Sequence, residues 1–278
     1  MKSKICMTAN FGFPYSEIEI FPKLKAAGFD GFFTGWWGRC NPREWAAAGR
    51  ANGLFYQSIH APFGGIDKMW VSGEVGDDAE AELCRCLDAC ADVEVPVMIS
   101  HAFIGFDKHE PNEIGAERFA RVGEHARKRG VVMAIENTEG EEYLAAAMEA
   151  TKGNPYVGFC LDTGHEMCYN RSKDMLALYG DRLAAVHLND NVGITGEKIT
   201  FLDDAHMMPF DGAADWADIV SRLDAHGFTG PYTFELTITN HEGRHTNDRY
   251  QQMTIEDYLA EVYERALRVR SLSKIANG

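Results

Sequence analysis

Short runs of apolar residues alternate along the chain with longer segments in which apolar residues recur every three or four positions. The short runs are continuous in hydrophobicity, which is typical of buried strands in a parallel sheet. In the longer segments the spacing is that of one helical face, as in Ile18, Phe21, Leu24 and Ala27. Expected strands cover 5–9, 31–36, 54–60, 96–101, 131–136, 157–162, 183–188 and 231–236, and expected helices cover 16–27, a segment starting at Pro42 after the N-cap Asn41, 77–93, 113–129, 141–151, 174–180, 216–227 and 255–273.

This alternation of eight strands with eight helices in 278 residues predicts an α/β protein with a single (β/α)8 TIM barrel over 1–278. Barrels of this kind need roughly 250 residues. No linker rich in proline, glycine or serine divides the chain into parts. An open, doubly wound sheet is the alternative, but no Gly-x-Gly-x-x-Gly motif follows the first strand to support a dinucleotide site.

Acidic residues and histidines lie at the carboxyl ends of six consecutive expected strands, from the third to the eighth. In (β/α)8 barrels the functional groups gather at that end. One histidine at a strand end is more often a hydrogen-bonded structural residue than a ligand, but six neighbouring ends with such residues are typical of a functional site. The residues are His60, His101, Glu136, Asp162 with His165, His187 and Glu235, and Asp204 and His206 follow in the loop after the seventh strand.

Four of these residues form a set of metal ligands: Glu136, Asp162, His187 and Glu235 would converge on the barrel axis. Three carboxylates without a counterion would repel one another strongly in a low dielectric. A cation removes that cost. Three carboxylates and one imidazole suit one divalent metal ion such as Mn²⁺, Mg²⁺ or Co²⁺, and Zn²⁺ also fits.

The strand ends also carry short motifs that resemble the xylose isomerase-like barrel superfamily, and the resemblance spans nearly the whole chain. That superfamily includes sugar and sugar phosphate isomerases and epimerases, hydroxypyruvate isomerase, inosose dehydratase and the endonuclease-four apurinic nucleases. The resemblance implies a metal-dependent sugar or sugar phosphate isomerase or epimerase. The motifs are Ser58-Ile59-His60, Ile135-Glu136-Asn137, Leu161-Asp162-Thr163-Gly164-His165, Val186-His187-Leu188-Asn189-Asp190 and Phe234-Glu235-Leu236.

The ketose 3-epimerase branch implies roles for particular residues. Positions matching the four ligands bind one divalent metal there, and the two that match Glu136 and Glu235 are also the paired acid and base. Positions matching Glu142 and His165 contact sugar hydroxyls. That branch has an arginine six residues beyond the histidine ligand, where this chain has Gly193. The departure argues against a strict ketose 3-epimerase.

The endonuclease-four branch implies a different activity, a phosphodiesterase with three zinc ions held by nine ligands. This chain has the matching residue type at all nine positions. They are His60, His101, Glu136, Asp162, His165, His187, Asp204, His206 and Glu235.

A small carbohydrate is favoured over DNA as the substrate. The formal net charge of −15 disfavours nucleic acid, because phosphate contacts need a basic surface. The nuclease must bind a DNA duplex with basic and polar loops. The corresponding loops here (11–13, 36–37, 67–70, 139–142) are aromatic, apolar or acidic, and aromatic side chains over a small cavity suit stacking on a sugar ring. In this interpretation the substrate contacts are His60, His101, Glu142, His165, His206, Trp36 and Trp70, and Asp204 is a candidate ligand for an additional metal.

The chemistry expected of this site is proton transfer at carbon. Glu136 or Glu235 would remove a proton next to a carbonyl, a metal ion would stabilise the enediolate as a Lewis acid, and the other glutamate would return the proton. A lyase of the inosose dehydratase type would use the same first step and is a further alternative.

Loop 239–253 with Arg244 and Arg249 is either a solvated connection or a lid that recognises a phosphate or carboxylate. Lys108 and His109 are expected at the surface. No apolar run approaches the roughly 20 residues that span a membrane, and no signal peptide precedes the first strand, so the expected location is cytoplasmic without membrane contact. The superfamily resemblance is compatible with a homo-oligomer.

Overall fold

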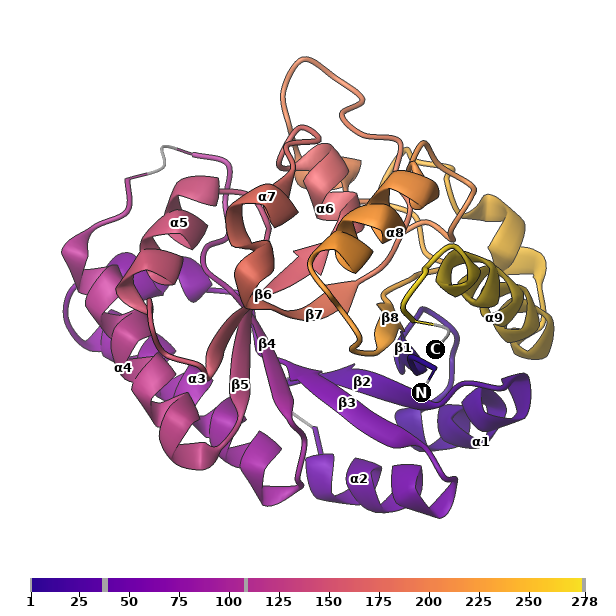
Figure 1. The fold of residues 1–278 in the computed structure, drawn as a ribbon, viewed down its shortest axis with the longest axis horizontal. Helices are drawn as coiled ribbons and strands as arrows, with labels where there is room; N and C mark the ends of the chain where they lie inside the picture. Colours follow the sequence, from indigo (N-terminus) through magenta and orange to yellow (C-terminus); the bar gives the residue numbers. More distant parts are fainter. Residues whose placement is uncertain (1, 37–39, 108–109, 277–278) are drawn as a thin grey trace.

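Eight parallel strands form one curved sheet with helices on its outer side in the computed structural model, which describes residues 2–36, 40–107 and 110–276 (Figure 1). Neighbours in the sheet follow the order β7-β6-β5-β4-β3-β2-β1-β8. Leu188 and Phe234 form a parallel bridge between the ends of β7 and β8, so the barrel is nearly closed. The predicted (β/α)8 barrel is confirmed.

Each strand lies within two residues of its predicted bounds. The runs predicted from hydrophobicity are buried over almost their whole length, which is why the pattern located them. The strands are β1 (Ile5–Thr8), β2 (Gly31–Gly35), β3 (Phe55–His60), β4 (Val97–His101), β5 (Val132–Glu136), β6 (Val157–Asp162), β7 (Leu183–His187) and β8 (Tyr232–Phe234).

The helices begin and end at local signals that the sequence contains. Asn41 accepts a hydrogen bond from the backbone N–H of Glu44 at 3.2 Å, so it caps the helix that starts at Pro42. Gly28 ends the first helix with φ 111°, a conformation that glycine adopts without strain. The helices are α1 (Glu17–Ala27), α2 (Pro42–Ala51), α3 (Glu74–Asp92), α4 (Glu113–Arg129), α5 (Glu141–Ala150), α6 (Thr163–Cys168), α7 (Met175–Tyr179), α8 (Trp216–Ala225) and α9 (Ile255–Ser271), with 3-10 turns η1 (Ile66–Trp70), η2 (Gly180–Arg182), η3 (Phe201–Asp203) and η4 (Asp248–Gln252).

The junction after β6 differs from the expectation that Thr163-Gly164 simply breaks the strand. Helix α6 starts there without a connecting loop, because the Asp162 carboxylate accepts the backbone N–H of His165 at 2.7 Å and caps the helix. The last residue of β6 is therefore also the N-cap of α6. This double role fixes where the acid and the histidine of the motif lie relative to each other.

The barrel interior holds a layer of small and branched side chains directly beneath the predicted site. Ile99, Ala134, Cys160 and Ala185, from β4 to β7, form a buried cluster of their own. Because side chains alternate between the two faces of a strand, the residue two positions further along points to the same side. Those residues are His101, Glu136, Asp162 and His187.

Within the described ranges, no helix has the length and apolar character needed to cross a membrane. Three residues discussed from the sequence, Trp37, Lys108 and His109, lie outside the described residues.

Candidate functional site

The four predicted ligands come together at the carboxyl ends of β5, β6, β7 and β8. One nitrogen or oxygen from each of Glu136, Asp162, His187 and Glu235 lies within 4.8 Å of the others. Asp162 and His187 are directly paired across β6 and β7, and Glu235 follows the last residue of β8. The barrel geometry thus gathers residues that are far apart in the sequence.

Glu136 is the centre of a wider group. Its Oε2 lies 3.2 Å from Nε2 of both His60 and His101, and its Oε1 lies 2.8 Å from Nδ1 of His187. The residue is only 1% exposed. Burial by itself raises the pKa of Glu136, but the surrounding imidazoles, His187 first, outweigh burial and hold the pKa well below its usual range.

A second group lies beside the first and joins the β6–α6 junction to the loop after β7. Asp204 Oδ2 lies 3.2 Å from Nε2 of His165 and 3.1 Å from Nε2 of His206. Burial works against ionisation of these groups, but the Asp204 carboxylate raises the pKa of His206 to about 10, and His206 and His165 hold the pKa of Asp204 far below its usual range. The other oxygen of Asp204 is buried and has no hydrogen-bond partner in the described part of the chain.

Three of these histidines are turned so that Nε2 faces a carboxylate. Nδ1 of His60, His165 and His206 lies 2.7, 3.0 and 3.1 Å from a backbone carbonyl oxygen, of Ala61, Asn137 and Glu235 respectively. A carbonyl only accepts hydrogen bonds, so Nδ1 carries the proton and the neutral ring has its lone pair at Nε2. A lone pair opposite a carboxylate oxygen is repulsive unless the ring is protonated or a cation lies between them. Carbonyls that hold the far nitrogen are typical of metal-bound histidines.

In the group of Glu136, Asp162, His187 and Glu235, the contacts of His187 also indicate a cation site. Its Nδ1 lies 2.8 Å from Glu136 Oε1 and 2.7 Å from Glu235 Oε2, although one N–H cannot serve two carboxylates fully. Its Nε2 is buried without a partner among the described residues. Burial opposes ionisation of the pair, but Glu235 and Glu136 hold the pKa of His187 well above its usual range and His187 lowers the pKa of Glu235 to about 2. The chemistry of this donor set fits a divalent cation.

Two asparagines, which sequence reasoning did not single out, orient Asp162. The Asn189 amide donates to Asp162 Oδ2 at 2.7 Å, and the Asn137 side chain accepts from the Asp162 N–H at 2.7 Å and donates to its carbonyl at 2.9 Å. Burial first, and then Glu136, raise the pKa of Asp162 to about 6 against the opposing effect of His165. Asn137 directly follows the proposed ligand Glu136, and Asn189 comes two positions after the proposed ligand His187.

A cavity of about 450 Å³ opens above the two groups. Its walls are largely aromatic: Phe63, Phe106 and Tyr169 come from loops or turns, and Phe201 comes from the 3-10 turn η3. Glu139, which is 8% exposed, also reaches the cavity and accepts the backbone N–H of Gly105 at 2.9 Å. The hydrophobic pattern did not indicate these residues, since loops have no periodicity. The cavity is also lined by His60, His101, Glu136, His165, Asp204, His206, Glu235 and His241.

Three predicted substrate contacts do not reach this cavity. Trp70 is 5% exposed, and its indole N–H donates to the Ala102 carbonyl at 2.8 Å, so it belongs to the packing layer. The Trp36 indole donates to Glu82 at 2.7 Å. Glu142 is exposed in the first turn of α5 and does not line the cavity. The aromatic wall exists, but other residues form it.

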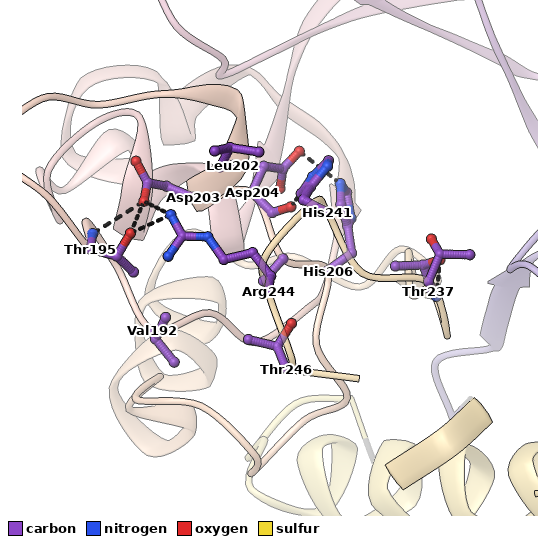
Figure 2. Close-up of a pocket in the computed structure, with 12 residues that line it drawn as sticks. Val192, Thr195, Leu202, Asp203, Asp204, His206, Thr237, His241, Arg244 and Thr246 are labelled. Atoms are coloured by element: carbon purple, nitrogen blue, oxygen red, sulfur yellow. Dashed lines mark hydrogen bonds and ion pairs between the residues drawn. The ribbon is translucent and has the colours of Figure 1, made fainter. Parts of the chain in front are cut away.

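A second cavity of about 290 Å³ adjoins the first, between the loop after β7 and the loop after β8 (Figure 2). Asp204, His206 and His241 line both cavities. Arg244 extends through the second cavity toward Thr195 and Asp203 (Figure 2). Arg249, the other arginine of loop 239–253, instead lies over the Tyr250 ring with 63% of its side chain exposed.

The chain is similar to one known protein in sequence and to solved structures in fold. An uncharacterized protein of Sinorhizobium fredii, y4fM, is 30% identical over 160 residues, which are 55% of this chain and about half (46%) of that protein. Among solved structures, a xylose isomerase-like TIM barrel/4-hydroxyphenylpyruvate dioxygenase fusion protein has a TM-score of 0.74 at 18% identity, with 97% of this chain and 43% of that chain covered. The 3-keto-D-glucoside 4-epimerase YcjR of E. coli has a TM-score of 0.69 at 19% identity, with 95% of this chain and 100% of that chain covered.

These structural matches share the fold. The sequence model described as the xylose isomerase-like TIM barrel matches residues 19–260, which is most of the chain. The side chains that the motifs place at the strand ends lie close enough together to hold a metal ion. The chain belongs to the xylose isomerase-like TIM barrel family.

Proposed function

We propose that the protein is a metal-dependent isomerase or epimerase of a sugar or sugar phosphate. The observation that carries the proposal is the pair Glu136 and Glu235, whose carboxylates flank one imidazole nitrogen at the floor of an aromatic-walled cavity. Two carboxylates that face one small cavity can remove a proton from carbon and return it. The E. coli structural neighbour is named a sugar epimerase, which is the same class of reaction.

The central group is the proposed site of the cation. Glu136, Asp162, His187 and Glu235 would hold Mn²⁺, Mg²⁺, Co²⁺ or Zn²⁺ through three carboxylates and one imidazole. When bound, the ion would supply Lewis-acid polarisation of the substrate's carbonyl and neighbouring hydroxyl oxygens, worth several kcal/mol.

The glutamates act on the substrate carbon in turn. One takes the proton next to the carbonyl, and the other returns a proton. Return to the opposite face of the same carbon gives an epimer, and return to the neighbouring carbon exchanges aldose for ketose. Both carboxylates face the same region, because they lie 2.8 and 2.7 Å from one atom, His187 Nδ1. Glu139 and the aromatic walls would bind the remaining hydroxyls and ring faces of the sugar.

A substrate panel in D₂O tests the proposal. The purified protein with added Mn²⁺ is incubated with ketoses, sugar phosphates and an inosose, and deuterium at each carbon is followed by NMR. Exchange at a carbon next to the carbonyl, with an isomeric product, is the expected result. Loss of water from the inosose would indicate the lyase alternative. Absence of exchange in every member of a broad panel, with cation bound, would overturn the proposal.

Glu136→Gln and Glu235→Gln test the assignment of the pair. Each change removes a proton acceptor at nearly constant shape, so turnover should fall by about 10²- to 10⁴-fold while sugar still binds. Because both glutamates are also proposed ligands, rates are compared at saturating Mn²⁺ with the bound metal measured. Glu149→Gln, at a glutamate of α5 whose side chain is 74% exposed, is the matched control and should keep its rate. Near-normal turnover in either site variant contradicts the assignment.

A phosphodiesterase with three cations is the second candidate function. The observation that favours it is the second group, His165, Asp204 and His206, together with His60, His101 and Glu136 as a third. Elemental analysis of protein loaded with excess Zn²⁺ separates the candidates: one ion per chain supports the sugar chemistry, and three support the phosphodiesterase. Salt-sensitive binding of duplex DNA containing an abasic site would strengthen the second.

A further inference from the structure

The second cavity has no role in the proton transfer proposed above. We propose that it is a subsite for an acidic group, a carboxylate or a phosphoryl group, carried by the sugar that reacts in the larger cavity, and that Arg244 binds this group. The inference rests on the proposed function for the reacting sugar. It narrows the substrate class to sugars that carry an acidic group.

Arg244 is the sole lysine or arginine among the described residues that line either cavity. One nitrogen, Nη2, donates to Thr195 Oγ1 at 2.6 Å and lies 3.4 Å from Asp203 Oδ1. Its Nε and Nη1 have no hydrogen-bond partner within the described ranges. A guanidinium held along one edge presents its remaining N–H groups in the fork that carboxylates and phosphates accept.

Asp203 fixes the arginine without competing for its free edge. The Asp203 side chain is 1% exposed, and it accepts hydrogen bonds from the N–H and hydroxyl of Thr195 and from the N–H of Thr200. Those donors already satisfy most of its acceptor capacity. A carboxylate occupied in this way anchors Arg244 and leaves charge on the guanidinium for a ligand.

The charge distribution around the cavities makes this position selective. The main cavity contains the carboxylates of Glu136, Glu139 and Glu235, which would repel an anion. The second cavity also has two carboxylates, but Asp203 is paired with Arg244 and Asp204 with His165 and His206. Arg244 lies in the adjoining cavity together with Asp204, His206 and His241 (Figure 2), and these three residues also line the main cavity. In a ligand with a neutral polyol part and an acidic end, the polyol part would contact the carboxylates and the acidic end would contact the arginine.

His241 is suited to the passage between the cavities. Its Nε2 donates to the Asp204 carbonyl at 2.8 Å, because a carbonyl cannot donate in return. The neutral ring therefore keeps Nδ1 as an acceptor. Phe201 meets this ring edge to face with the centroids 5.6 Å apart, so the wall offers an aromatic surface and an acceptor for a hydroxyl.

Calorimetric binding with three probes that differ only at carbon six tests the subsite. The probes are D-fructose, its 6-phosphate and its 6-carboxylate, D-fructuronate. The proteins are the wild type, Arg244→Gln, Arg244→Lys and the matched control Arg249→Gln, which removes the same charge from the same loop outside the cavities. We expect at least one acidic probe to bind about ten- to a hundredfold more tightly than fructose, the value of hydrogen bonds to a charged group. Arg244→Gln should abolish that preference, Arg244→Lys should keep part of it, and Arg249→Gln should keep it whole.

The outcomes separate cleanly. Preference for the phosphate or for the carboxylate identifies which acid the subsite takes. Equal binding of all three probes by the wild type overturns the inference, and so does a preference that survives in Arg244→Gln. If Arg244→Gln does not fold, Arg244→Lys and the salt dependence of the wild type decide, because only a charge-bound probe loses affinity as salt rises. Acid-selective binding without deuterium exchange in any sugar would instead contradict the proposed function and still support the subsite.

Discussion

Asp162 has both of its carboxylate oxygens engaged by the protein, Oδ2 by the Asn189 amide and Oδ1 by the His165 N–H, each at 2.7 Å. Such partners orient a metal ligand and raise its affinity for the ion. Asn189→Ala removes the amide and should weaken Mn²⁺ binding by about 10- to 100-fold. Calorimetric titration of the metal measures the effect. Asn52→Ala, which removes an amide at the end of α2, is the control, and unchanged metal affinity in Asn189→Ala would exclude the orienting role.

At the same scale, the sequence predicted site residues on strands better than those on loops. His101, Glu136 and His187 end continuous apolar runs, so the burial pattern and the barrel rule together gave their positions. Cavity-wall residues such as Phe63 and Phe106 come from loops, where no periodicity says which way a side chain points. The sequence alone therefore could not separate Trp36 and Trp70 from the residues that line the cavity. In the structure their indoles donate to Glu82 and to the Ala102 carbonyl instead.

At the scale of elements, the junction of β6 and α6 leaves no space beside Gly164. A Cβ atom there would lie 1.9 Å from Asn189 Oδ1. Gly164→Ala should therefore displace the asparagine that holds Asp162, destabilise the fold by about 1–3 kcal/mol and weaken metal binding. Denaturant unfolding and metal titration measure the two effects. Gly196→Ala, whose Cβ would meet one atom at 3.9 Å, is the control.

The proposed cause can be checked by coupling. In an Asn189→Ala background the obstructing amide is absent, so Gly164→Ala should cost much less than it does in the wild type. If the two costs simply add, the close contact is not the reason for the destabilisation.

The elements themselves followed from the sequence wherever hydrophobic periodicity and caps agreed. Helix α4 has the predicted bounds, 113–129, because Asn112 caps its start and Gly130 adopts the left-handed conformation at its end. Helix α6 was missed because Thr163-Gly164 indicates a turn, whereas the Asp162 cap that starts the helix depends on tertiary placement of that side chain. The 3-10 turn η1 (66–70) was missed for a similar reason, since Trp70 packs against Phe119 and Tyr143 from distant helices.

At the scale of the whole molecule, the buried site couples stability to pH and to cations. Without a cation, pairing with carboxylates raises the pKa of His206 to about 10, and of His165 and His187 well above the usual range, despite burial. A raised pKa in the folded state stabilises the fold fully below the unfolded value of about 6.5 and progressively less as pH rises toward the folded value. The cation-free protein should therefore lose stability from about pH 6.5 toward pH 10 through these groups.

A cation at the central group reverses that trend for His187, because it takes the place of the proton on that proposed ligand. Its affinity should increase with pH, and binding should release protons. With cation at about 100 times its dissociation constant, the free energy of unfolding should rise by about 2.7 kcal/mol, or several degrees in melting temperature. Thermal melts with Mn²⁺, or with NaCl at matched ionic strength, measure this at about pH 6 and about pH 8. The Mn²⁺ shift should be larger at the higher pH. A shift that is equal at both pH values, or that NaCl reproduces, would mean that the ion acts on the −15 net charge of the chain and not on the imidazole and carboxylate cluster.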